Sequence, residues 1–360
     1  MLLCLVGAVA LAGPSPERLL ADAARRVERG DPQGALDRLG EIDDADLSGA
    51  DQAERLRVLA DAHRLVAGHD KTADPGFHLT RAFEAHQRCV ESEGPGQAVH
   101  AKHCMGQEDL LVRALAERAA GIASALELGL AAAPKELADR CDQLAALRPK
   151  EAAAPLCRAR LGWATADADA SRGAFDAALA LPASDDRDKA LAQAASTLLQ
   201  RLGDAEGAAA LVDRVPEADR GPRMAALGRS IAIFREKFVP LRDAAHAEPA
   251  DPKAWRRWLS ALGEGGLWVL GRSESALAVE RCKDDPLVWL TAASLDTRDA
   301  AAVPKDLPTR HRDRQIQAHL KRALERLEAC AALDGAPDTC ASQATAVKQQ
   351  LTALDARLAP

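Results

Sequence analysis

The feature that most constrains the fold of this chain is a proline-containing mark in the sequence that recurs every 33 or 34 residues. Pro149, Pro182 and Pro216 follow this spacing, and each closes a stretch with the periodicity of an amphipathic helix. The spacing recurs further along, because the Asp-Pro-x-x-Trp pattern of residues 251–255 returns at 285–289. A fixed period of this length is typical of a protein built by stacking one supersecondary unit several times.

The residues between two marks predict that the unit is a pair of helices. One helix is expected over about 190–201 and a second over about 205–214, with Gly203 in the turn because glycine tolerates positive φ. Hydrophobic residues make up 48% of the 360-residue chain but aromatics only 3%, so alanine and leucine, both helix formers, supply most of the apolar content. No alternating run of β-branched residues predicts a strand. We therefore expect an all-α fold.

These marks resemble the tetratricopeptide repeat (TPR), a 34-residue helix-turn-helix unit with a bulky residue in the first helix, an alanine early in the second and a proline near the end. The resemblance is clearest over residues 135–296, although the family's tyrosine is missing because the chain contains none. It implies an α-solenoid of antiparallel helix-turn-helix pairs. We expect TPR-like repeats at 135–296, preceded by irregular helical pairs at 13–134.

The remaining segments complete this expected organisation. Residues 297–360 are predicted to form a linker and a C-terminal capping hairpin, with helices over about 311–333 and 339–358. Irregular segments are expected to interrupt the array at 68–80, 92–97, 263–273 and 296–309.

The first twelve residues predict export. Residues 1–12 are apolar and end in Ala-Leu-Ala, which is typical of a secretory signal peptide; a buried first helix is the alternative interpretation. The run is too short to cross a bilayer as a helix. We expect an exported protein, periplasmic or associated with the outer envelope, with no integral membrane span in the mature chain.

Six cysteines are placed symmetrically about predicted turns. Residues equidistant from the turn of a helical hairpin face one another, so each pair could reach disulfide geometry. We predict three disulfides within hairpins, which agree with export to an oxidising compartment. The candidates are Cys89 with Cys104, Cys141 with Cys157, and Cys330 with Cys340, while Cys282 is left as a buried packing residue.

One constellation offers an alternative chemistry. His86, Cys89, His100 and either His103 or Cys104 could surround a tetrahedral zinc ion if these cysteines stayed reduced. This alternative makes residues 86–104 the centre of a metal-binding or enzymatic helical module. If these residues do not bind zinc, we expect no metal, no cofactor, no catalytic residues and no enzyme activity. The formal charge of −7 argues against a nucleic-acid partner.

Stacked helical pairs leave a groove that can receive a segment of another protein. Trp and Arg side chains are favoured anchors in such contacts, and the candidates are Arg256, Arg257, Trp258 and Trp268. Trp255 and Trp289 share one repeat position and are expected to pack in the core. The sequence therefore predicts a non-enzymatic interaction scaffold of the cell envelope, whose partner is another envelope protein.

Overall fold

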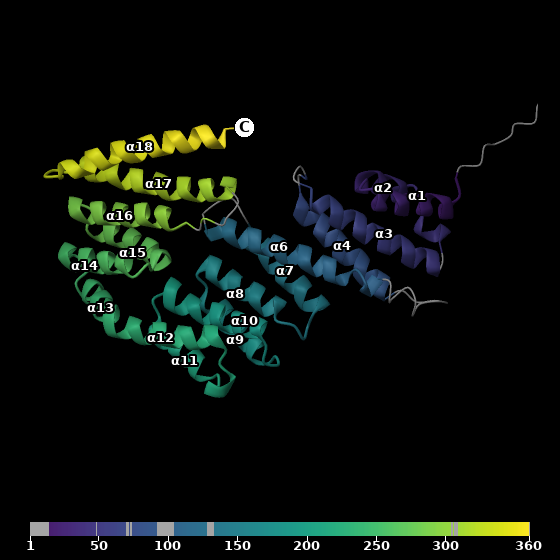
Figure 1. The fold of residues 1–360 in the computed structure, drawn as a ribbon, viewed down its shortest axis with the longest axis horizontal. Helices are drawn as coiled ribbons and strands as arrows, with labels where there is room; N and C mark the ends of the chain where they lie inside the picture. The colour runs from purple at the N-terminus through teal and green to yellow at the C-terminus, as the bar shows by residue number, and fades with distance from the viewer. Residues whose placement is uncertain are drawn as a thin grey trace, which may run out of the picture. The chain divides into compact units, whose positions relative to one another are not determined.

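The computed structural model describes residues 14–47, 49–69, 72, 74–91, 104–127, 133–303, 305 and 309–359, and these contain helices and no strand (Figure 1). The all-α prediction is confirmed for these residues, whereas the predicted leader, 1–12, lies outside them. The chain divides into two compact units. Unit 1 comprises Met1–Ile122 and Lys135–Pro149, and unit 2 comprises Ala123–Pro134 and Lys150–Pro360.

Unit 1 is built from helices of 9 to 20 residues, with one short 3-10 turn, around small apolar cores. Its elements are α1 (Pro16–Glu28), α2 (Pro32–Gly40), η1 (Asp44–Asp46), α3 (Ala50–Ala67), α4 (Pro75–Val90), the larger part of α6 (Glu108–Glu127) and α7 (Pro134–Leu147). Leu19 and Leu20 of α1 pack with Leu39 of α2 and Val58 of α3 in one core. The α3 and α4 helices lie against each other along their length.

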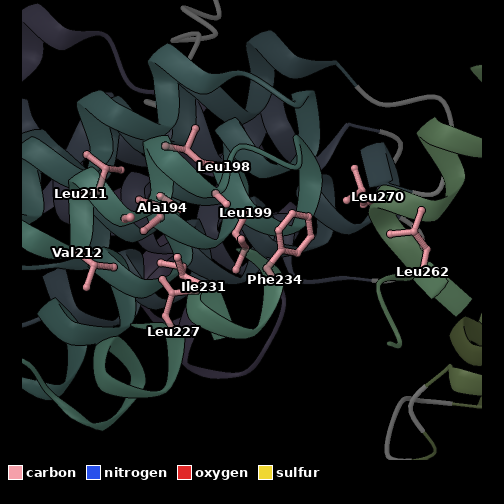
Figure 2. Close-up of a cluster of buried hydrophobic side chains, with 14 of the residues drawn as sticks. Ala194, Leu198, Leu199, Leu211, Val212, Leu227, Ile231, Phe234, Leu262 and Leu270 are labelled. Carbon is pink, nitrogen blue, oxygen red and sulfur yellow. The ribbon is translucent and has the colours of Figure 1, made fainter. Parts of the chain in front are cut away.

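Unit 2 is a succession of helices in which contacts run between neighbours along the chain. Its elements are α8 (Ala153–Thr165), α9 (Ala168–Leu179), α10 (Asp185–Ser196), η2 (Thr197–Arg201), α11 (Ala205–Asp213), η3 (Glu217–Asp219), α12 (Pro222–Lys237), α13 (Val239–Ala247), α14 (Pro252–Glu264), α15 (Trp268–Arg281), α16 (Pro286–Ala302), α17 (Thr309–Ala331) and α18 (Asp338–Leu358). Most contacts join a helix to the next or the next but one, as α10 joins α12 and α14 joins α16. A continuous core runs from α8 to α16, part of which is drawn in Figure 2, and a second core joins α16, α17 and α18.

Four helices begin at an Asp-Pro pair. The aspartate caps the helix by accepting a backbone N–H bond, and the proline occupies the first turn, where no N–H partner is needed. This rule accounts for the predicted marks at 251 and 285, since Asp251 caps α14 and Asp285 caps α16 with Oδ1–N distances of 2.8 and 3.0 Å. The same pairing starts α2 at Asp31 and α4 at Asp74.

The α12 helix is capped by another helix instead of by its own N-cap residue, Gly221. Asp188 of α10 accepts hydrogen bonds from the backbone N–H groups of Arg223, at 3.0 Å, and Met224, at 3.3 Å. A Cβ on Gly221 would lie 2.3 Å from the Asp188 carboxyl carbon, so only glycine leaves room for this carboxylate. A buried side chain thus joins the starts of two helices that are separated by about one repeat.

Two of the predicted hairpins are helical on both sides of their turns, as expected. The α10–η2 segment turns into α11 at Gly203, which has a φ of +69°, and α17 turns into α18 at Gly335, which has a φ of +72°. Two predicted irregular stretches are largely helical instead. The glycines at 263–266 form only a short turn between α14 and α15, and α16 continues to Ala302.

The predicted cysteine pairs are disulfide-bonded. Cys89 and Cys104 have Cα atoms 6.2 Å apart, and Cys330 and Cys340 have Cα atoms 5.9 Å apart. Cys141 and Cys157 are likewise disulfide-bonded, while Cys282 is a free, buried thiol, as expected.

Candidate binding groove

An apolar groove of about 500 Å³ opens on unit 2, and we call it the aromatic groove. Four segments of the chain line it: α8, η2, the C-terminal half of α12 with Phe238 after it, and the start of α15 with the turn before it. Its apolar lining comprises Trp163, Leu199, Ile233, Phe234, Phe238, Leu267, Trp268 and Val269, with Gln200 and Ser230 as the polar members.

One wall depends on a π-helical turn. Residues Thr197–Arg201 form a π-helix, which carries one more residue per turn than an α-helix and often occurs at functional sites. Leu198 and Leu199 are both buried, and Leu199 lies beside Phe234 at the edge of the core (Figure 2). Gln200 then follows in the groove lining, so this turn supplies an apolar and a polar side chain in succession.

Another part of the lining depends on glycine. A Cβ on Gly265 would lie 2.6 Å from Cζ of Phe238, and Gly266 has a φ of +67°, which L side chains rarely adopt. Phe238 can therefore lie against the α14–α15 turn, where it stacks on Phe234 with ring centroids 5.4 Å apart. Ile233 remains 49% exposed beside these rings. The groove thus presents preformed apolar surface to solvent, as binding sites commonly do.

A charged cluster adjoins the groove through Trp163. The side chain of Trp163 hydrogen bonds with Glu127, near which lie Arg160, Arg201 and Arg272. Burial raises the pKa of Glu127 even though these arginines favour its ionised form. Burial, followed by the charge of Arg272, lowers the pKa of Arg201. Arginines therefore outnumber carboxylates at this end of the groove, although Asp299 also pairs with Arg272 at 3.6 Å.

The structure places only one of the four predicted partner-binding residues in this groove. Trp268 lines it, whereas Arg256 and Arg257 do not. The expectation that Trp258 lies at the surface is wrong, because Trp258 is fully buried and its indole N–H donates to Glu274 at 2.7 Å. Trp258 lies three residues after Trp255 and therefore on the same inward face of α14.

The two tryptophans at the shared repeat position make the same contact. The indole N–H of Trp255 donates to the Pro249 carbonyl, and that of Trp289 donates to the Lys283 carbonyl, six residues earlier in each case. Trp255 is buried, as expected for a core residue, and Trp289 is half-buried. Sequence reasoning missed Trp163, Ile233 and the Phe234–Phe238 pair.

The alternative zinc set at 86–104 is not assembled by the described residues. Cys89 is in a disulfide, so it offers no thiolate, and His100 and His103 lie outside the described residues. His86 is buried with its Nε2 3.5 Å from a carboxylate oxygen of Glu108, and burial lowers the pKa of the His86 imidazole. Within the described ranges, no group of three or more potential ligands gathers.

Comparison with protein-family models and with curated proteins returns no match for this chain. Among the described helices, none is both long and apolar enough to cross a membrane.

Proposed function

We propose that this protein is a non-enzymatic interaction scaffold of the cell envelope, and that its aromatic groove binds an apolar segment of another envelope protein. The observation that carries this proposal is the preformed apolar lining, in which Trp163, Phe238 and Trp268 stand together with the exposed Ile233. Aromatic side chains in a concave site supply most of the binding energy in protein interfaces.

The charges beside the groove select the kind of segment. Arg160, Arg201 and Arg272 surround Glu127, whose ionised form is disfavoured by burial. A partner that carries a carboxylate next to its apolar anchor would complement this excess of positive charge, whereas a basic partner would be repelled. The proposed occupant is therefore an acidic segment of another protein with an aromatic or aliphatic anchor.

Two further observations support the architecture and the location that we propose. Contacts in unit 2 run mainly between successive helices, and the sequence marks recur every 33 or 34 residues, both of which support a TPR-like solenoid. Three disulfide-bonded cysteine pairs favour an oxidising compartment, and with the leader predicted at 1–12 they support export.

A cross-linking experiment tests the proposal. A photo-reactive residue in place of Ile233 is expected to capture one envelope protein from intact cells, and mass spectrometry of the cross-link locates the captured segment. We expect an acidic segment with an apolar anchor. Trp163→Ala combined with Trp268→Ala is expected to abolish capture.

The matched control is Trp289→Ala, which removes a half-buried tryptophan that does not line the groove. This variant is expected to leave capture unchanged, and circular dichroism checks that all variants keep their helix content. Capture that survives loss of both groove tryptophans, or a captured segment that is basic, would overturn the proposal.

A further inference from the structure

A histidine cluster lies on unit 1, which contains no part of the aromatic groove. Four of the nine histidines of the chain belong to the short span that covers α3 and α4, namely His63, His69, His78 and His86. His63 on α3 and His78 on α4 face each other with their Nδ1 atoms 2.9 Å apart. Their ring centroids are 5.1 Å apart, and the ring planes are inclined at 43°.

The paired nitrogens are in the chemical form that binds metals. Two Nδ1 atoms at this distance share one proton, so one ring donates and the other presents a lone pair. The ring that accepts this hydrogen bond is neutral, and neutral imidazole is the commonest metal ligand in proteins.

The spacing fits a shared ion after a small adjustment. Zinc–nitrogen bonds of about 2.0–2.1 Å at a tetrahedral angle place two nitrogens about 3.3 Å apart, a few tenths of an ångström more than here. The donor ring needs only to move its proton from Nδ1 to Nε2, which leaves both Nδ1 lone pairs directed to the metal. The ends of two packed helices hold the rings, so little side-chain freedom remains to be lost.

An open space beside His78 could hold the remaining ligands. A cavity of about 450 Å³ is lined by His78, His69, Thr72, Val66 and the Gly30–Gln33 turn. Water or a small anion can enter this space and complete a coordination shell that two imidazoles leave open. His69 lines the same cavity, although the described residues gather no group of three ligands.

We propose that His63 and His78 form a two-histidine site for a divalent transition-metal ion. Imidazole donors suit Cu²⁺, Zn²⁺ and Ni²⁺, whereas Mg²⁺ and Ca²⁺ require oxygen ligands. The usual order of affinities for divalent metals predicts that Cu²⁺ binds more tightly than Zn²⁺ at such a site. This inference is independent of the proposed groove function.

Isothermal titration calorimetry of the full chain, without a histidine tag, tests the site with Cu²⁺, Zn²⁺ and Mg²⁺ as probes. We expect one equivalent of Cu²⁺ to bind, Zn²⁺ to bind more weakly and Mg²⁺ not to bind. His63→Ala and His78→Ala are each expected to weaken Cu²⁺ binding at least about tenfold. His246→Ala is the matched control, since His246 lies in unit 2 and pairs with Glu274 at 2.8 Å.

A second readout keeps the proposal testable if an alanine variant unfolds. Electron paramagnetic resonance of the Cu²⁺-loaded protein is expected to show coupling to two imidazole nitrogens, and to one in His63→Gln or His78→Gln, which retain a polar side chain. Cu²⁺ affinity that is unchanged in the folded glutamine variants would overturn the site. Absence of Cu²⁺ binding by the unmodified protein would do the same.

Discussion

The carboxylate of Asp188 is predicted to contribute more to the stability of unit 2 than the carboxylates of the other aspartates on α10, because it supplies the cap that α12 lacks. Asp188→Ala removes two hydrogen bonds from a charged acceptor to the backbone N–H groups of Arg223 and Met224. Asp188 is 5% exposed and Met224 is fully buried, so water compensates poorly. Loss of a cap and of charge-assisted hydrogen bonds together predicts a destabilisation of about 2–4 kcal/mol.

The glycine opposite this carboxylate makes the prediction sharper. Gly221→Ala places a Cβ 2.3 Å from the Asp188 carboxyl carbon and must displace the carboxylate, so it should cost about 2–3 kcal/mol by losing the same bonds. Once Asp188 is alanine, the displaced group is gone. The same glycine substitution should then be nearly neutral, because alanine also restricts the unfolded chain.

Tryptophan fluorescence is the appropriate assay, since all five tryptophans lie between residues 163 and 289, within unit 2. Urea unfolding of the two single variants and the double variant gives a coupling energy, expected to exceed about 1.5 kcal/mol. Asp185→Ala is the control. Its carboxylate is 65% exposed and pairs at the surface with Arg223, so its loss should cost less than about 0.5 kcal/mol. Additive effects of Asp188→Ala and Gly221→Ala would refute the shared-cap reasoning.

Three further predictions concern other parts of unit 2. Replacing Cys330 and Cys340 together by alanine opens a loop with a sequence separation of 10 and should destabilise the α17–α18 hairpin by about 2–3 kcal/mol. The loss should appear as faster amide hydrogen exchange in this hairpin. Unchanged exchange would contradict this prediction. Gly203→Ala places a side chain at a φ of +69° and should destabilise the folded protein by about 1 kcal/mol. Gly173→Ala, on the exposed side of α9, should stabilise it by up to about 1 kcal/mol. Urea midpoints of the two variants that shift in the same direction would be inconsistent with this. The folded-state pKa of Glu127 is raised, so the stability that this carboxyl group contributes is present below its ordinary pKa of 4.5 and is lost as pH rises. In urea titrations, Glu127→Gln should therefore gain stability relative to the parent between pH 4.5 and 7. A stability difference that does not change with pH would contradict this assignment.

Features that one short segment encodes could be predicted from the sequence. The Asp-Pro pairs at 251–252 and 285–286 determine helix starts locally. The aspartate side chain caps the helix, and the proline ring fixes a helical φ in its first turn. The cysteine pairs were predictable for a related reason. A tight turn fixes which residues of a hairpin face each other, so equal distances from the turn suffice to pair Cys330 with Cys340.

The binding groove could not be predicted in this way, because its residues come together from segments far apart in the chain. Trp163 and Trp268 are about a hundred positions apart, and no local pattern links them. Trp258 was misplaced because it has no equivalent one repeat away, whereas helical spacing from Trp255 decides its burial. The Phe234–Phe238 spacing of four residues was the available signal for one wall.

The π-helical turn at Thr197–Arg201 carries a consequence for how such a groove can arise or be lost. A π-turn holds one residue more than the α-turn it replaces, so deleting a single residue there converts it into ordinary helix. The flanking helix faces would keep their directions because the π-turn had absorbed the extra residue, and the change would fall on the side chains of the turn itself. A single-codon deletion could therefore close one wall of the groove while leaving the chain helical, and a single-codon insertion in an ordinary repeat could open one.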